Sequence, residues 1–139
     1  MANMIDSQLE VRGQISEVDR FIAKSTGQSG IDLVAACQGV KDPFLFDQDA
    51  MKLRPGMYDI EGQSRYLFRF RTKWNPPIEF VRSLSLEYPG LEFALHYYDL
   101  LGSCYGDFEV RNGEVRIQNN RKLDEITAYE RRNLDGCMI

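Results

Sequence analysis

The segment from residue 65 to residue 90 constrains the fold more than any other part of this 139-residue chain. It begins with ten alternating residues, RYLFRFRTKW. One set of alternate positions is mostly aromatic: Tyr66, Phe68, Phe70, Thr72 and Trp74. The other set is mostly basic: Arg65, Leu67, Arg69, Arg71 and Lys73. This period of two predicts a strand over 65–74 with one side buried and the other side in solvent.

A helix is predicted directly after this strand. Asn75 is a favoured N-cap residue, and Pro76 suits the first helical position because its φ is fixed and it lacks an N–H donor. A stripe at helical spacing follows, which is expected to face inward: Ile78, Val81, Leu84, Ser85 and Tyr88. Proline disfavours helical geometry in the residue before it, so Tyr88-Pro89-Gly90 predicts the end of this helix. We therefore expect structural roles for five residues: Trp74, Pro76, Pro77, Tyr88 and Pro89.

A similar unit opens the chain. Residues 5–12 alternate and predict a strand that turns Ser7, Leu9 and Val11 to one side. Ser16, with Asp19 three residues later, predicts the N-cap of a helix that Gly27 ends. Beyond the central helix, strands are predicted over 91–98, 104–110 and 114–118.

Two other stretches complete the fold prediction. Residues 28–63 contain several glycines and prolines between short apolar pieces, so we expect an irregular insertion. A narrow apolar stripe predicts a terminal helix over 121–134. The whole pattern predicts an α+β fold, a two-layer ferredoxin-like sandwich with two helices on one face of an antiparallel sheet. No internal repeat or linker argues for a second domain, so residues 1–139 are expected to form one domain.

Composition excludes several classes of protein. The chain has 17 Lys and Arg against 21 Asp and Glu, a net charge of −4, so it is not a polycation drawn as a whole to nucleic acid or anionic lipid. No apolar run approaches the ~20 residues needed to cross a bilayer, and the opening residues lack a signal-peptide pattern. We expect no membrane partner. Three widely spaced cysteines, Cys37, Cys104 and Cys137, indicate reduced thiols and a cytoplasmic location.

No metal, cofactor or catalytic site is predicted. A metal site needs several ligands at suitable spacing, and the chain has one His and no close pair of Cys. Two interpretations of His96 are open: a dyad with Cys104 across a hairpin, or a histidine on the sheet surface. The surface histidine is favoured, because only Asp99 could orient the ring. Phosphate-binding loops, dinucleotide fingerprints and nucleophile elbows are also missing from the sequence.

The basic side of the strand over 65–74 is the candidate binding surface. On an open sheet face it would lie beside other polar and aromatic side chains, which gives the set Arg65, Arg69, Arg71, Lys73, His96, Tyr98 and Tyr105. Basic residues interleaved with aromatics on an open sheet are typical of RNA-recognition domains. The same alternation, however, turns four carboxylates to this face: Glu10, Glu92, Asp107 and Glu109. We expect these carboxylates to neutralise the arginines in cross-strand pairs.

Several of these motifs together resemble a known family. They are the opening MANMIDSQLEVRG, the step Lys73-Trp74-Asn75-Pro76-Pro77, Leu84-Ser85 with Tyr88-Pro89-Gly90-Leu91-Glu92-Phe93, and the Gly106 strand that ends in Asn112-Gly113. Over roughly residues 1–118 the chain is similar to the YubB-type ferredoxin-like proteins that phages and plasmids carry. The resemblance implies the fold, a mobile-element origin and a bacterial cytoplasm. That family has no agreed activity, so the resemblance implies no catalytic residue.

Two hypotheses of function follow from the sequence. The first is a non-enzymatic accessory protein of a phage or plasmid that binds a host or element-encoded protein. Its sharpest form is inhibition of a host defence system, of the anti-CRISPR or anti-restriction type, because a small acidic protein can occupy a basic nucleic-acid groove. The alternative is a nucleic-acid-binding module that uses the open sheet face.

Overall fold

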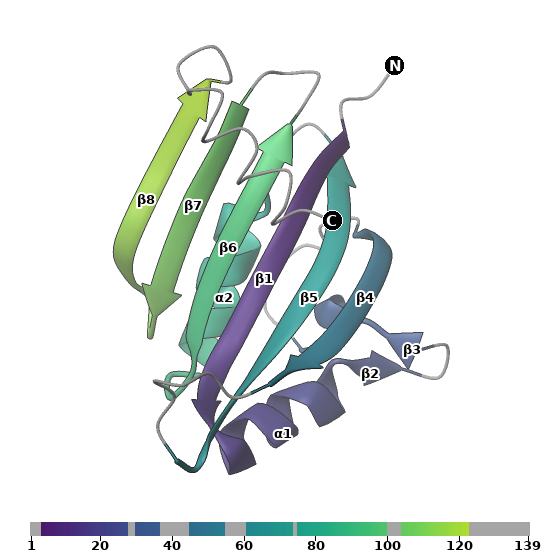
Figure 1. Ribbon diagram of the computed structural model, residues 1–139, viewed down its shortest axis with the longest axis vertical. Helices are drawn as coiled ribbons and strands as arrows, with labels where there is room; N and C mark the ends of the chain where they lie inside the picture. Colours follow the sequence, from purple (N-terminus) through teal and green to yellow (C-terminus); the bar gives the residue numbers. More distant parts are fainter. Residues whose placement is uncertain are drawn as a thin grey trace.

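The computed structural model describes residues 4–27, 30–36, 45–54, 61–73, 75–99 and 104–122. These residues form a six-stranded antiparallel sheet with two helices (Figure 1). The strands of the sheet are β1 (Met4–Gln14), β4 (Phe46–Leu53), β5 (Gln63–Lys73), β6 (Glu92–Asp99), β7 (Cys104–Arg111) and β8 (Glu114–Lys122). The helices are α1 (Ile15–Lys24) and α2 (Ile78–Glu87). A small ribbon of β2 (Thr26–Gly27) and β3 (Gly30–Ile31) and a 3-10 turn, η1 (Leu33–Ala36), lie between α1 and β4 in the sequence.

The strand order is β4-β5-β1-β6-β7-β8, with every neighbouring pair antiparallel. The first six large elements follow each other as β1-α1-β4-β5-α2-β6, which is the split β-α-β order of ferredoxin-like domains. β7 and β8 then extend the sheet beside β6 as a meander. The antiparallel sheet and the two helices agree with the sequence prediction.

Strand β4 corrects the prediction of an irregular insertion over 28–63. It pairs with β5 and is the edge strand of the sheet. Its sequence, FDQDAMKL, does not alternate cleanly, because an edge strand buries neither face fully and because a bulge lies between Phe46 and Asp49. Asp47, in this bulge, has a positive φ of 54°. The shift in phase removes the period-two signal on which the sequence prediction depended.

The core lies between the helices and one side of the sheet. Phe21 of α1 packs edge-on against three rings, at centroid distances of 5.7 Å to Phe68, 5.6 Å to Phe93 and 5.0 Å to Tyr88. Helix α2, seen behind β6 in Figure 1, adds three buried side chains to the same cluster: Phe80, Val81 and Leu84. Both described helices pack on this side of the sheet, so neither of them covers the opposite side.

Both helices begin differently from the prediction. α1 begins at Ile15, directly after β1, so Ser16 lies in the first turn and is not the N-cap. The Ile15 N–H donates to the Gly62 carbonyl, at 3.0 Å, which replaces a side-chain cap. α2 begins at Ile78 with Pro77 as its N-cap, so Asn75 is not the cap and Pro76 is not the first helical residue. Pro76 and Pro77 disfavour helical geometry at Asn75 and Pro76, the residues directly before them.

The ends of two elements bear on the remaining predictions. α2 ends at Glu87, as the Tyr88-Pro89-Gly90 stop predicts. β8 continues to Lys122, so a terminal helix cannot begin at residue 121; residues 123–134 lie outside the described part of the chain, as do Trp74, Cys37 and Cys137. Neither described helix is long and apolar enough to cross a membrane.

Candidate interaction face

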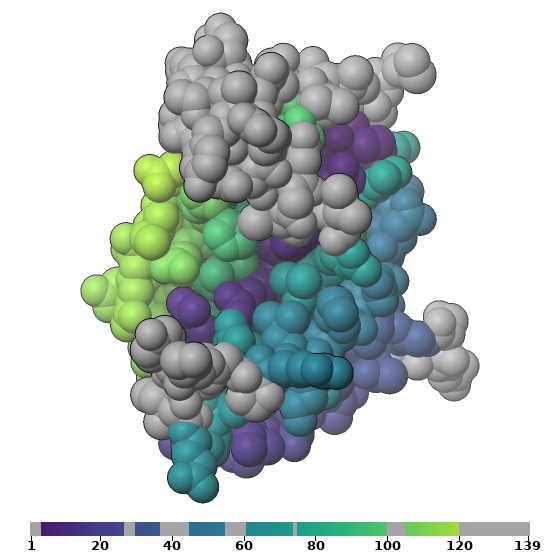
Figure 2. All heavy atoms as spheres, in the orientation of Figure 1, coloured from purple at the N-terminus to yellow at the C-terminus, as the bar shows by residue number. Residues whose placement is uncertain are grey.

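The side of the sheet that faces away from the helices is called here the outer face. Strict alternation along the four central strands places these residues on it: Asp6, Gln8, Glu10, Arg12, Arg65, Leu67, Arg69, Arg71, Lys73, Glu92, Ala94, His96, Tyr98, Tyr105, Asp107, Glu109 and Arg111. Figure 2 views this side, where the described strands follow one another from the yellow-green β8 to the blue β4. Every site residue that the sequence predicted, other than the structural set, lies on the outer face.

The arginines of β5 are paired with carboxylates of the two neighbouring strands. Arg65 Nη1 lies 3.1 Å from Glu10 Oε1. Arg69 Nη2 lies 2.9 Å from Asp49 Oδ2, and Arg71 Nε lies 2.7 Å from Asp6 Oδ1. These are ordinary charge-assisted hydrogen bonds. The predicted neutralisation of these arginines is therefore present.

The predicted partners, however, are only partly correct. Glu10 does pair with the basic row, but Glu92, Asp107 and Glu109 do not contact its arginines. Strand β5 has β1 and β4 as neighbours, whereas β6 lies two strands away, which is about 10 Å. The arginines of β5 consequently pair with carboxylates of β1 and β4, whereas the sequence had predicted partners on β6 and β7 as well. Lys73 instead has its Nζ 5.2 Å from the centre of the Phe46 ring.

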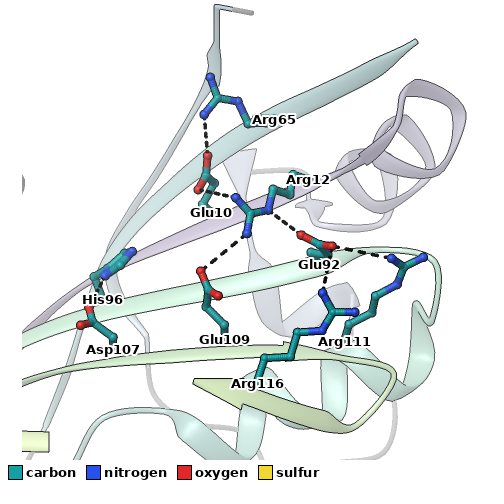
Figure 3. A network of polar contacts seen from close by, with 9 residues as sticks. All are labelled: Glu10, Arg12, Arg65, Glu92, His96, Asp107, Glu109, Arg111 and Arg116. Carbon is teal, nitrogen blue, oxygen red and sulfur yellow. Dashed lines mark hydrogen bonds and ion pairs between the residues drawn. The ribbon is translucent and has the colours of Figure 1, made fainter. Parts of the chain in front are cut away.

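A second group of charges gathers at the end of the sheet near the Asn112-Gly113 turn (Figure 3). Arg12 Nε lies 2.7 Å from Glu92 Oε2, and the Arg12 guanidinium also lies 3.6 Å from Glu109 and 3.9 Å from Glu10. Glu92 in turn accepts longer contacts from Arg111 at 3.6 Å and Arg116 at 3.5 Å. Glu92 is thus surrounded by three guanidinium groups.

Arg12, Arg111 and Arg116 were not predicted as site residues from the sequence. The alternation of β1 already turned Arg12 to the same side as Glu10, and the Asn-Gly turn placed Arg111 at the end of its strand. Both residues could therefore have been predicted from the sequence. Arg116 was not predictable, since a register shift in the β7–β8 pair changes which way β8 residues face.

His96 and Asp107 face each other across β6 and β7 (Figure 3). His96 Nδ1 lies 2.5 Å from Asp107 Oδ1. This hydrogen bond to Asp107 raises the pKa of His96 above its ordinary value of 6.5, against the lowering effect of burial. The negative charges of Asp107, Glu10 and Glu109 act in the same direction as the hydrogen bond.

The register of the β6–β7 pair also bears on the alternative interpretation of His96 as a dyad with Cys104. Cys104 lies opposite Asp99, three positions along the strand from His96, which corresponds to about 10 Å. The carboxylate that orients His96 is Asp107, not Asp99. Among the residues that the structure describes, no group of three His, Cys, Asp or Glu side chains is placed to hold a metal ion.

Tyr98 and Tyr105 lie directly opposite each other on β6 and β7, next to the His96–Asp107 pair. Both side chains are half-buried. The pair therefore forms an aromatic patch beside the charged part of the outer face.

Of the predicted structural residues, Tyr88 is buried and hydrogen-bonded. Its side chain is 3% exposed, and its hydroxyl donates to the Ala36 carbonyl at 3.1 Å. The Arg20 guanidinium lies 5.3 Å from the centre of its ring. Tyr88 therefore joins the end of α2 to α1 and η1, whereas Pro89 is exposed in the following turn.

Comparison with known proteins identifies a domain family. The family model described as "Ferredoxin-like domain in Api92-like protein" matches residues 57–133, more than half of the chain. The match includes β5, α2, β6, β7 and β8, which carry most of the outer face. No curated protein and no solved structure matches the chain.

Proposed function

Since this chain belongs to the family described as the ferredoxin-like domain in Api92-like protein, we propose that it is a non-enzymatic accessory protein that binds another protein through its outer face. In this proposal the sheet and helices act as two layers. The helical layer supplies the core, and the outer face supplies the contacts. The observation that carries the proposal is the pairing of the β5 arginines with Glu10, Asp49 and Asp6 at 2.7–3.1 Å.

Such pairing favours a protein partner over a polyanion. A polyanion gains affinity by replacing counterions on unneutralised cations, and these cations already have carboxylate partners. A face that alternates positive and negative side chains is instead complementary to a second face with the opposite alternation. Charge complementarity of this kind contributes mainly to specificity and to the choice of partner.

The biological setting of the proposal is a phage or plasmid in a bacterial cytoplasm. The resemblance of the Lys73-Trp74-Asn75-Pro76-Pro77 step and the Tyr88-Pro89-Gly90 turn to YubB-type proteins supports this setting. The net charge of −4 favours a partner with a basic surface. Inhibition of a host defence system, of the anti-CRISPR or anti-restriction type, is the specific form that we propose.

The test is affinity capture from lysate of the native host, with a charge-swap variant as the comparison. The double substitution Arg69→Asp with Asp49→Arg exchanges the two members of one ion pair. It keeps the attraction between them but reverses the charge pattern that a partner meets. We expect mass spectrometry to find a protein that wild type enriches and the double variant does not. A matching thermal melt for the two proteins would show that the fold is kept.

Equal capture by wild type and the charge-swap variant would contradict a protein interface on the outer face. The single variants Arg69→Asp and Asp49→Arg serve as controls, because each leaves two like charges together. If both singles and the double lose the partner, the pattern itself is recognised. If only the singles lose it, the pair matters for stability alone, which also contradicts the proposal.

A nucleic-acid-binding module is the second candidate, and one observation favours it. Tyr98 and Tyr105 form an aromatic patch on the outer face, and bases stack on such patches in single-stranded nucleic-acid binders. Arg71 lies on the same face, on the far side of β1. This candidate requires that a phosphate displace Asp6 from Arg71, at a pair distance of 2.7 Å. Salt-dependent binding of a single-stranded oligonucleotide would decide it.

A further inference from the structure

A groove of about 550 Å³ lies at the end of the sheet, between β1, α1 and the turn before β6. Its volume is within the range of ligand-binding clefts. Its charged lining consists of Arg12, Arg111 and Arg20 together with Glu17 and Glu92. It is called here the Arg111 groove. Arg12, Glu92 and Arg111 also belong to the outer face, so the groove continues that face around the end of the sheet.

Two arginines of this groove, Arg111 and Arg20, are less well satisfied than the arginines of β5, whereas Arg12 is paired with Glu92 at 2.7 Å. Arg111 lies 3.6 Å from Glu92, and Arg20 lies 3.7 Å from Glu17. Arg116, beside the groove, also lies 3.5 Å from Glu92. These distances exceed the 2.7–3.2 Å of a good N–H···O hydrogen bond. A guanidinium has five N–H donors, so donors on these three side chains remain available to an external acceptor.

The charge of the groove suits a carboxylate better than a phosphate. Three arginines face two glutamates in the lining, which leaves a net charge of +1 in a chain whose total is −4. One carboxylate brings a single negative charge, whereas a phosphate group brings about −1.5 to −2. The two glutamates in the lining would repel the larger charge more strongly. Glu92, held among Arg12, Arg111 and Arg116, shows that a carboxylate fits guanidinium groups at this place.

The backbone at the side of the groove is open to an approaching chain. A Cβ atom added at Gly90 would meet nothing nearer than Glu17, at 3.9 Å. Gly90 therefore leaves room for a segment of another polypeptide to pass close to the turn that precedes β6.

We propose that the Arg111 groove binds an acidic segment of the protein partner, with one carboxylate of that segment bound by Arg111 and Arg20. This inference rests on the proposed function, because it adds the chemistry of the partner to a protein-binding face. The acidic segment would complement the groove locally, while the rest of the outer face meets charges of both signs.

The test uses synthetic peptides and NMR of the 139-residue chain. The probe is a short N-acetylated, C-amidated peptide of Gly, Asp and Glu, and the matched control replaces Asp and Glu by Asn and Gln. We expect the acidic probe alone to shift the amide signals of Gly90, Glu92 and Arg111. Arg111→Gln and Arg20→Gln should each weaken the binding about tenfold, as loss of a charged hydrogen bond does. Arg82→Gln, exposed on α2 and outside both the groove and the outer face, should leave it unchanged.

Three results would overturn the inference: no saturable shifts, equal shifts with the neutral peptide, or tighter binding of inorganic phosphate than of the acidic probe. The glutamine variants remove exposed charges from Arg111 and Arg20, and unchanged spectra elsewhere would confirm their fold. The native partner gives a separate readout. A partner lost with the Arg69/Asp49 charge swap but retained by Arg111→Gln would overturn the groove alone. A partner indifferent to the charge swap would overturn the proposed function while leaving the peptide result intact.

Discussion

His96 is the residue whose environment makes the most direct prediction about pH. Its hydrogen bond to Asp107 raises its pKa above 6.5, so the folded protein binds this proton more tightly than the unfolded chain does. The stabilisation is therefore fully present below a pH of about 6.5 and is lost as pH rises through the folded pKa. We expect wild-type stability to fall over this window more than that of Asp107→Asn.

An NMR titration checks the cause, because His96 is the one histidine in the chain and its ring signals need no separation. Asp107→Asn removes the nearest negative charge and leaves at most a neutral amide oxygen as the hydrogen-bond acceptor, so the pKa of His96 should move down. Glu109→Gln removes a smaller contribution to the pKa of His96 and is the matched control. A wild-type pKa at or below 6.5, or one that Asp107→Asn leaves in place, would contradict the account.

Gly106 makes a second prediction at the scale of one residue. It faces Tyr97 across the β6–β7 pair, and a Cβ atom built on it would overlap the Tyr97 ring and the Asn119 carbonyl. Tyr97 is fully buried, so it cannot swing aside. Gly106→Ala should lower the free energy of unfolding by about 1–3 kcal/mol, the usual cost of overpacking. Urea denaturation measures this loss. Gly90→Ala is the control, because a Cβ atom there would make only ordinary van der Waals contact with Glu17. Equal stabilities for the two variants would show that the Gly106 contact is relaxed easily.

At the scale of elements, β5 is joined to β4 by the ion pair Arg69–Asp49 and to β1 by the ion pair Arg71–Asp6. Both pairs are exposed at the surface, and exposed pairs contribute about 0–1 kcal/mol each. Arg69→Ala with Arg71→Ala should therefore cost only a modest part of the stability. Arg82→Ala, on the solvent side of α2, is the control for loss of an arginine side chain. A loss of several kcal/mol in the double variant would mean that these arginines hold β4 in place.

The same elements show what the sequence could and could not predict. The central strands β1, β5 and β6 alternate because one face of each is buried in the core, so their positions and outward residues were predictable. β4 has no such face, and its bulge interrupts the phase. Without β4, the neighbours of β5 could not be assigned. For that reason Asp49 was missed as the partner of Arg69. Glu92 was expected to pair with the arginines of β5, which lie two strands away from it.

Helix boundaries were less predictable than the strands for a related reason. Local capping signals at Ser16 and Asn75 compete with contacts made by distant residues. The Gly62 carbonyl, which lies far from Ile15 in sequence, accepts its N–H and lets α1 begin without a side-chain cap. The stop at Tyr88 was predictable because proline acts on the residue directly before it.

At the scale of the whole molecule, the charges are arranged so that neither sign dominates the outer face. The basic row of β5 meets Asp6, Glu10 and Asp49, and Arg12 meets Glu92. The remaining imbalance is local and lies at the Arg111 groove, whereas the chain as a whole carries −4. A polyanion approaching from a distance therefore meets a net repulsion, and a basic partner meets a net attraction.

This balance gives the prediction that separates the two candidate functions. We expect a fluorescent single-stranded RNA or DNA oligonucleotide to show no measurable anisotropy change at about 150 mM salt, because the phosphates would have to displace the carboxylates of Asp6 and Asp49. Lowering the salt to about 50 mM tests the residual attraction, since each phosphate contact adds about one unit to the salt slope.

If binding does appear, Arg71→Ala should reduce that slope by about one unit and Tyr98→Ala should weaken binding by about 1–3 kcal/mol per stacked base. Binding at the higher salt that both substitutions weaken, with the fold kept, would replace the protein-binding proposal by the nucleic-acid one. Binding that neither substitution affects would place the nucleic acid away from the outer face.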